Sequence, residues 1–369
     1  MKVSIIVTYT NNYELMENFL EHIVKITKKY EYELILVQDC IASMKLLNLI
    51  NKFVEESNTI FHFITDIDHR GYSKVNNFGV EKSSGDTLVF INTDVFPDSE
   101  AIHILCKELW SNTSYGIVQG LLIYPHNNTV QSTGHVFGNY FNHHALVNAE
   151  INEPIVQQKA IRQGVTSAFY AIRKQHFDLV KGFDTYYYNA WDGLDLSLKV
   201  THDLGLYCMY IPESQAYHIQ GSSRDVIYRN TDYQNAYFWT KWHDKIQIDY
   251  PKLILIQLKS SDFEPNQSYT IINCSTYPLD SWDPILSNLK LQYKATFTIK
   301  RYSKKEQIKL EESFSKILLE RASPIIYLTD HFKELENNYR TFKLVANKDD
   351  FIIDLHGNIK FITKFLDLT

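Results

Sequence analysis

Short apolar runs alternate with longer amphipathic segments over the first hundred residues of the chain. The runs predict four strands, at Val3–Tyr9, Glu33–Val37, Ile60–Ile64 and Thr87–Asn92. Helices are predicted between them, at Tyr13–Tyr30 and Ser73–Lys82. This alternation is typical of βαβ units, which build a mainly parallel sheet with right-handed crossovers.

The pattern changes twice after this region. From Gly116 to His218 the strands become shorter, with turns and aromatic segments that favour a mixed sheet and loops around a second substrate's pocket. After Pro251 strands are predicted again, with one charged helix and a final hairpin, at Ser268–Ile272, Ala295–Ile299, Pro324–Leu328, Lys304–Ala322 and around Asp354–Asn358. We therefore predict an α/β protein of two domains, a Rossmann-like mixed sheet over residues 1–250 and a smaller α/β domain over residues 251–369.

Composition supports this division and excludes some functions. A chain of 369 residues with 44% hydrophobic content is long enough for two cores. The net charge of −6 and the absence of a basic patch argue against nucleic-acid binding. The four cysteines lack the paired spacing of zinc or redox motifs, and no apolar run approaches the ~20 residues that span a bilayer. We expect free thiols and a soluble cytoplasmic protein, with membrane contact at most peripheral.

The most informative chemistry follows the fourth predicted strand. The apolar run from Thr87 ends in Asn92, Thr93 and Asp94. Ligands of open parallel sheets bind beyond the carboxyl ends of the strands, so these polar groups face a site and not the core. A carboxylate there suits a divalent cation that holds a diphosphate.

Five segments, taken in order, carry a resemblance to a known family. They are Ser4–Asn11, Arg70–Gly79, Gly85–Asp94, Lys181–Asp184 with Asp192–Leu196, and Pro212–Ser222. Residues 1 to about 245 resemble the inverting family 2 glycosyltransferases of the GT-A fold, in the branch that builds bacterial surface polysaccharides. The last third of the chain shows no such match.

The resemblance implies a divalent cation, Mn²⁺ or Mg²⁺, that takes up the charge of the leaving diphosphate. Asp94 would be its carboxylate ligand, because this position closes the family's DxD-type motif. Asn92 stands at the first acid of that motif and would contact ribose, water or the metal. His218 stands where the family often places a second ligand. A turn-capping role for Asp94 and a packed role for His218 are the alternatives.

The resemblance also implies which residues hold the nucleotide-sugar. The residues expected to do so are Thr8, Tyr9, Asn11, Asp39, Arg70, Asn77, Asn92, Thr93, Ser167 and Trp191. Asp39 would accept a hydrogen bond from the base or from sugar hydroxyls, although Gln38 and Cys40 depart from the usual pattern around it. Trp191 would stack on a sugar ring, and the turn at Ser167 would leave room for one, with serine replacing the usual glycine.

Inversion by direct displacement needs a base for the acceptor hydroxyl. The family's Glu-Asp-x-Asp motif aligns with Asp192, Gly193 and Asp195, and its second acid, often the base, is Gly193 here. We assign the base to Asp192, with Asp195 as the alternative or as an N-terminal helix contact. His135, His143 and His144 fit no regular metal spacing and suggest an acceptor-side loop.

These residues predict a metal-dependent inverting glycosyltransferase. It would move a sugar from a nucleoside diphosphate, UDP or dTDP, to a saccharide or lipid-linked saccharide hydroxyl. A non-catalytic nucleotide-sugar-binding or scaffold protein is the alternative that Gly193 keeps open. A nucleotidyltransferase is a weaker option, because Thr10-Asn11-Asn12 is no Gly-rich loop. The C-terminal domain would contact a partner subunit, the membrane or the acceptor.

Overall fold

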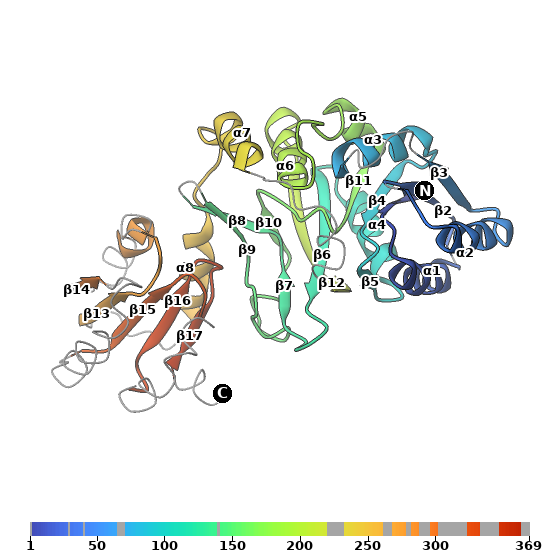
Figure 1. Cartoon of the computed structure of the whole chain (residues 1–369). Coiled ribbons are helices and arrows are strands. Elements are labelled where there is room, and N and C mark those ends of the chain that lie inside the picture. The colour runs from blue at the N-terminus through green and yellow to red at the C-terminus, as the bar shows by residue number, and fades with distance from the viewer. Residues whose placement is uncertain are drawn as a thin grey trace. The chain divides into compact units, whose positions relative to one another are not determined.

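A computed structural model gives the structure of the chain (Figure 1). It describes residues 2–28, 30–39, 41–64, 71–138, 141–219, 232–260, 268–277, 282–287, 296–301, 323–332 and 347–362. The chain divides into two compact units: residues 1–135 with 147–246, and residues 136–146 with 247–369. A short segment from the middle of the chain thus belongs to the C-terminal unit. The α/β class, the large mixed sheet and a smaller C-terminal sheet domain are all confirmed.

The first unit is built on a ten-stranded mixed sheet whose main path runs β10-β12-β6-β11-β4-β1-β2-β3. Its strands are β1 (Val3–Tyr9), β2 (Tyr32–Gln38), β3 (Ile60–Ile64), β4 (Thr87–Ile91), β5 (Val95–Pro97), β6 (Tyr115–Ile123), β7 (Val130–Ser132), β10 (Ala160–Arg162), β11 (Phe169–Arg173) and β12 (Tyr207–His218). The strands β3, β2, β1 and β4 are mutually parallel, whereas β11 is antiparallel to both β4 and β6. The predicted N-terminal parallel sheet is present, with boundaries that differ by a few residues.

Helices cover both faces of this sheet. The helices of the unit are α1 (Tyr13–Thr27), α2 (Met44–Glu55), α3 (Tyr72–Lys82), α4 (Ala101–Ser111), α5 (Lys174–Leu179), α6 (Asp192–Asp203) and α7 (Asp232–Trp242). Side chains of α1, α2 and α4 share one core with Ile5 and Val7 of β1, whereas those of α3, α5 and α6 pack with Ile6. Because both faces are buried, β1 is apolar along nearly its whole length.

Two elements of this unit carry candidate site residues at their ends. β12 continues past Pro212 to His218, so His218 is the last residue of the strand. α6 begins at Asp192, its first helical residue. β12 reaches twelve residues because it pairs with β6, β10 and β5. Its pairing with β6 has an irregularity between Ile211 and Gln215.

The second unit contains a five-stranded sheet of order β14-β13-β15-β16-β17. Its elements are α8 (Tyr250–Ser260), β13 (Ser268–Asn273), β14 (Thr296–Arg301), β15 (Ile325–Thr329), β16 (Phe351–Asp354) and β17 (Ile359–Phe361), together with the β8 (His135–Gly138) and β9 (Phe141–His144) pair. The three strands predicted here and the hairpin that follows Asp354 are confirmed. The helix predicted at Lys304–Ala322 lies outside the described residues.

Candidate active site

Polar side chains gather at the carboxyl edge of the parallel strands of the large sheet. There β4 ends at Ile91, and Asn92 begins a tight turn in which its carbonyl accepts the Val95 amide hydrogen at 3.1 Å. The Asn92 amide nitrogen in turn donates to the Ala168 carbonyl at 3.1 Å. This turn carries Asp94, which is only 3% exposed. A carboxylate is thus held at low exposure where ligands of such sheets bind.

His218 lies beside Asp94 because β12 pairs with β5, which places His218 opposite Val95. The His218 Nε2 atom is 3.3 Å from Asp94 Oδ1. On the other side of the ring, His218 Nδ1 is 2.5 Å from Gln131 Oε1 on β7, and Gln131 Nε2 donates to the His218 carbonyl at 3.2 Å. A carboxamide oxygen only accepts, so Nδ1 carries the donated proton and Nε2 faces Asp94.

The chemistry of this pair fits a hard divalent cation. Cis ligands on an octahedral ion, each about 2.1 Å from it, have donor atoms about 3 Å apart, close to the separation of Nε2 and Oδ1. A carboxylate, an imidazole whose far nitrogen is hydrogen-bonded, and a supporting amide form a donor set known from metal sites. Without a cation, the same geometry serves an ion pair between protonated His218 and Asp94.

Protein ligands alone would not complete such a site. Within the described ranges, no group of three or more His, Cys, Asp or Glu side chains is arranged to hold a metal ion. Mg²⁺ and related ions often use one or two protein ligands and take the rest from water and substrate phosphates. The two residues Asp94 and His218 therefore suit an ion that binds together with a diphosphate.

Two of the residues predicted to hold the nucleotide make hydrogen bonds within the protein. The Tyr9 hydroxyl lies 3.2 Å from Gln38 Oε1 and 2.6 Å from His62 Nε2, which joins the ends of β1 and β2 to β3. Asn11 Oδ1 accepts the Ser43 amide hydrogen at 2.9 Å and so supports the N-terminus of α2. Thr8, on the opposite side of β1 from Tyr9, is partly exposed at this edge.

Asp39 and Asn77 hold the backbone around α3. Asp39 Oδ1 accepts the amide hydrogen of Gly71, the N-cap of α3, at 3.3 Å. Asn77 uses both ends of its carboxamide on Phe183, donating to the carbonyl at 2.9 Å and accepting from the amide at 3.0 Å. Asn77 thus has a clear structural role, and Asp39 contacts the turn after Arg70, which itself lies outside the described residues.

The start of α6 places one aspartate and one aromatic ring at the site. Trp191, the N-cap, lies in the left-handed region with φ of 71°, a conformation that costs a non-glycine residue about 1–3 kcal/mol. Its ring packs on Phe238 with centroids 4.6 Å apart. Asp192 follows as the first helical residue and is 3% exposed. Strained backbone of this kind is concentrated at functional sites, which makes this junction notable.

Asp192 is held by a hydroxyl in a buried aromatic setting. Ser167 Oγ donates to Asp192 Oδ1 at 2.5 Å, and the Tyr72 hydroxyl donates to the Ser167 carbonyl at 2.8 Å. Burial raises the pKa of Asp192, although the Ser167 hydroxyl and nearby amide hydrogens oppose that rise. The charge of Asp192 in turn contributes to the raised pKa values of Tyr72 and Tyr170, after burial. A carboxylate of this kind is a stronger base than an exposed aspartate.

Asp195 is placed quite differently, although it is one turn further along the same helix. Lys241 Nζ lies 2.6 Å from its Oδ1, Lys199 Nζ lies 3.5 Å from its Oδ2, and Trp242 Nε1 donates to it at 2.8 Å. The side chain is fully buried. Asp195 therefore ties α6 to α7, with two cations and an indole around its carboxylate.

Four residues near these groups were not predicted from the sequence. Gln131 supports His218 and His62 contacts Tyr9, whereas Tyr72 and Tyr170 lie close enough to Asp192 for its charge to affect their pKa values. Tyr72 lies within the segment Arg70–Gly79 that carries the family resemblance, which was its one available signal. The others come from β7, β3 and β11, and only the folded sheet brings them to the site.

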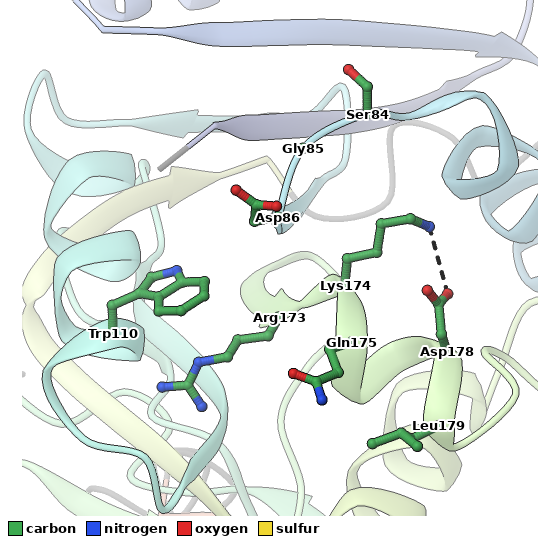
Figure 2. Close-up of a pocket in the computed structure, with 9 residues that line it drawn as sticks. All are labelled: Ser84, Gly85, Asp86, Trp110, Arg173, Lys174, Gln175, Asp178 and Leu179. Carbon is green, nitrogen blue, oxygen red and sulfur yellow. Dashed lines mark ion pairs between the residues drawn. The ribbon is translucent and has the colours of Figure 1, made fainter.

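A pocket of 620 Å³ lies at the opposite, amino edge of β4 (Figure 2). Asp86 on the loop before β4, Trp110 on α4 and Lys174 and Gln175 on α5 line it. Arg173, which also lines it, donates to four backbone carbonyls between the end of α4 and the start of β6, those of Leu109, Asn112, Thr113 and Tyr115, and stacks against Trp110. None of the residues predicted for the nucleotide-sugar lines this pocket, so the two features are distinct.

Comparison with known proteins agrees with the geometry of the first unit. Residues 4–169 match the model of glycosyl transferase family 2. The chain is 25% identical over 231 residues to the O-antigen biosynthesis protein RfbC of Myxococcus xanthus, covering 60% of this chain and 18% of that protein. It is 26% identical over 261 residues to the uncharacterized protein y4gI of Sinorhizobium fredii, covering 68% and 27%. The chain thus spans about a fifth to a quarter of the length of these relatives.

A solved structure supports the fold at greater distance. The structure of GalNAc-T7 with UDP, GalNAc and Mn²⁺ superposes with a TM-score of 0.55 at 13% identity, covering 88% of this chain and 59% of that one. At this identity the likeness concerns the fold alone. Among the described helices, none combines the length and the apolar character needed to cross a bilayer.

Proposed function

Residues 4–169 belong to glycosyl transferase family 2, and on that premise we propose that this chain is a metal-dependent, inverting glycosyltransferase. It transfers a sugar from a nucleoside diphosphate to a hydroxyl group of a saccharide. The observation that carries the proposal is the placement of Asp94 and His218 3.3 Å apart at the carboxyl edge of the sheet. Asp192 joins the same edge through the 167–168 turn, which contacts both Asn92 and Asp192.

Asp94 and His218 hold the cation in this proposal, with Gln131 orienting the imidazole. A bound divalent ion supplies positive charge to the leaving diphosphate. Thr8, Asn92 and Thr93 line the same edge and are candidates for donor contacts. Asp39, Ser167 and Trp191 are further candidates among the described residues. Tyr9, Asn11 and Asn77 act indirectly, because their polar groups support the strand ends and α3.

Asp192 is the base that accepts the proton of the acceptor hydroxyl as that oxygen attacks the anomeric carbon. Its raised pKa keeps it basic, and it lies at the start of α6 beside Trp191. Asp195, the alternative, is paired with Lys241 and Lys199, so its carboxylate is already in contact with two cations. We therefore assign proton removal to Asp192 and a structural role to Asp195.

The similarity to an O-antigen biosynthesis protein supports a saccharide or lipid-linked saccharide as acceptor. We propose UDP- or dTDP-sugars as donors. The C-terminal unit, residues 136–146 with 247–369, is proposed to contact a partner, the acceptor or a membrane surface, since it contains none of the residues assigned to transfer.

The test is release of nucleoside diphosphate from UDP-, dTDP- and GDP-sugars, with Mn²⁺, with Mg²⁺ and with chelator. Release from one donor that requires a metal and is lost in Asp94→Ala is expected. Asp98→Ala is the matched control, because Asp98 is an exposed acid four residues further along the same segment. The anomeric configuration of the transferred sugar, read by NMR, then tests inversion.

Two other outcomes would change the proposal. Nucleotide binding without release from any donor, even with saccharide acceptors present, would favour a non-catalytic nucleotide-sugar-binding protein. Release that persists in chelator and in Asp94→Ala would exclude the assigned metal role while leaving the family membership intact.

A further inference from the structure

Two positions that set this chain apart from the family pattern, Ser167 and Gly193, are in contact in the folded protein. A Cβ atom built on Gly193 would overlap the Ser167 hydroxyl and lie 3.2 Å from its nitrogen and 3.3 Å from its Cβ. The backbone of Gly193 is not in the left-handed region, so conformation does not demand glycine there. Space favours it, because in the observed rotamer the Ser167 hydroxyl occupies the position that a Cβ at 193 would take.

The backbones on both sides of this contact are tied together. Ser197 Oγ accepts the Val165 amide hydrogen at 3.1 Å and donates to the Gly193 carbonyl at 2.6 Å. Ser197 and Gly193 are buried, whereas Ser167 is partly buried. The turn before β11 and the first turn of α6 are thus held at a set distance, and an overlap at 167 and 193 is not easily relieved.

The Ser167 hydroxyl uses its proton on Asp192. It donates to Asp192 Oδ1 at 2.5 Å, and the Tyr72 hydroxyl fixes the Ser167 backbone by donating to its carbonyl. The acceptor Oδ1 belongs to the carboxylate to which proton removal was assigned above. A serine in place of glycine at 167 therefore adds a hydrogen bond to the base and removes the room for an acid at 193.

We propose that Ser167 is a positioning residue for Asp192, and that residues 167 and 193 share one space in which only one of them can carry a side chain. This inference rests on the proposed function for its catalytic part, because it concerns the base of that reaction. Its steric part rests on packing alone. Glycine at 193 then accommodates the hydroxyl at 167, and the absence of an acid at 193 does not mean that the site is inactive.

The catalytic part predicts a change in the pH profile. The Ser167 hydrogen bond favours the ionised carboxylate and so opposes the effect of burial on the pKa of Asp192. In Ser167→Ala this bond is lost, the pKa of Asp192 rises further, and the acidic limb of kcat/KM moves to higher pH. We expect kcat to fall roughly tenfold to a hundredfold with little change in donor KM, because the base loses its orientation.

Ser214→Ala is the matched control for this experiment. Ser214 is a fully buried serine of the same unit that donates to a backbone carbonyl, Ala101, and not to a carboxylate. Loss of the Ser214 hydroxyl should leave the acidic limb of the kcat/KM profile at its wild-type pH. Ser167→Thr, which keeps the hydroxyl, should retain the wild-type limb. An unmoved limb in Ser167→Ala, or the same movement in Ser214→Ala, would overturn the positioning role.

The steric part is tested by thermal unfolding of Gly193→Ala, Ser167→Gly and the double variant. Gly193→Ala should lower Tm by about 5 °C, as expected for an overpacked core. In the Ser167→Gly background, Gly193→Ala should lower Tm by less than half as much. If Gly193→Ala lowers Tm equally in both backgrounds, residues 167 and 193 do not share one space. Because this measurement needs no substrate, it remains decisive even if no donor is turned over, so failure of the inference and failure of the proposed function are distinguishable.

Discussion

The two edges of the large sheet each contain a buried carboxylate, and the pKa values of the two are shifted in opposite directions. At the amino edge, Glu33 accepts hydrogen bonds from Ser4 Oγ at 2.7 Å and from the Ser84 hydroxyl at 2.6 Å and amide at 2.5 Å, and pairs with Lys2 at 3.2 Å. Burial alone would raise its pKa, but these donors outweigh burial and lower the pKa to about 2. At the carboxyl edge, burial outweighs the hydrogen bonds and the pKa of Asp192 is raised.

The difference follows from the groups that surround each carboxylate. Glu33 is surrounded by enough donors, one of them cationic, that its charge strengthens the junction of β1, β2 and the loop before β4. Asp192 receives a single side-chain donor and no cation in the described contacts, so it keeps the ability to take a proton. The same contrast recurs within α6, where Asp195 resembles Glu33 because it is paired with Lys241 and Lys199.

The largest effect that separates the two edges is expected from Asp192→Asn. Amide in place of carboxylate removes the base, so kcat should fall by about 10²- to 10⁴-fold, while Tm stays near the wild-type value because a buried charge is removed. Steady-state transfer rates and thermal unfolding measure both. Turnover within twofold of wild type would refute the base assignment.

Glu33→Gln should do the reverse, with a loss of stability and unchanged turnover by the folded protein. A carboxylate whose folded pKa is about 2 and whose unfolded pKa is about 4.5 contributes about 3 kcal/mol to folding above pH 4.5, and this contribution is lost as pH falls from 4.5 toward 2. Urea unfolding at pH 7 and at pH 3 checks the prediction. The gap between wild type and variant should narrow at pH 3, and a gap independent of pH would contradict it.

Asp195→Asn tests whether the second aspartate of α6 belongs with Glu33 or with Asp192. Loss of its charge leaves Lys199 and Lys241 near an amide, although Lys241 keeps Asp184 at 3.0 Å. We expect the free energy of unfolding to fall by about 2 kcal/mol. Denaturant unfolding measures it, with Asp192→Asn as the comparison. A fall in kcat without a fall in the free energy of unfolding would return Asp195 to the list of candidate bases.

The smallest effect is expected from Gln131→Leu, which removes the hydrogen bond on the far side of His218. Supporting residues of this kind alter metal affinity by about tenfold or more. Mn²⁺ titration, followed by quenching of intrinsic fluorescence, should show weaker binding with no loss of Tm beyond a few degrees. Unchanged Mn²⁺ affinity in Gln131→Leu and in His218→Ala together would remove His218 from the proposed site.

Sequence patterns were sufficient for the parts of the molecule whose cause is local. The apolar runs at Val3–Tyr9 and Ile60–Ile64 form strands over those same residues, because short runs rich in β-branched and aromatic side chains favour the extended conformation. The helix predicted to Tyr30 ends at Thr27, a difference of the usual size for helix ends. Asp94 and His218 were singled out as a pair 124 residues apart in the chain, and the structure brings them to 3.3 Å.

What the sequence by itself determined is the alternation of the predicted N-terminal strands and helices, the α/β class and the match of residues 4–169 to a family model, since periodicity and short motifs depend on neighbours along the chain. What only the tertiary structure decided is the state of each polar group at the sheet edges. Tyr9 and Asn77 proved to be occupied with other residues of the protein, and Asp192 and Asp195, three residues apart, received opposite surroundings. The charge, burial and free space around each group are set by atoms from distant strands and helices. The spacing of residues along the sequence therefore does not predict them.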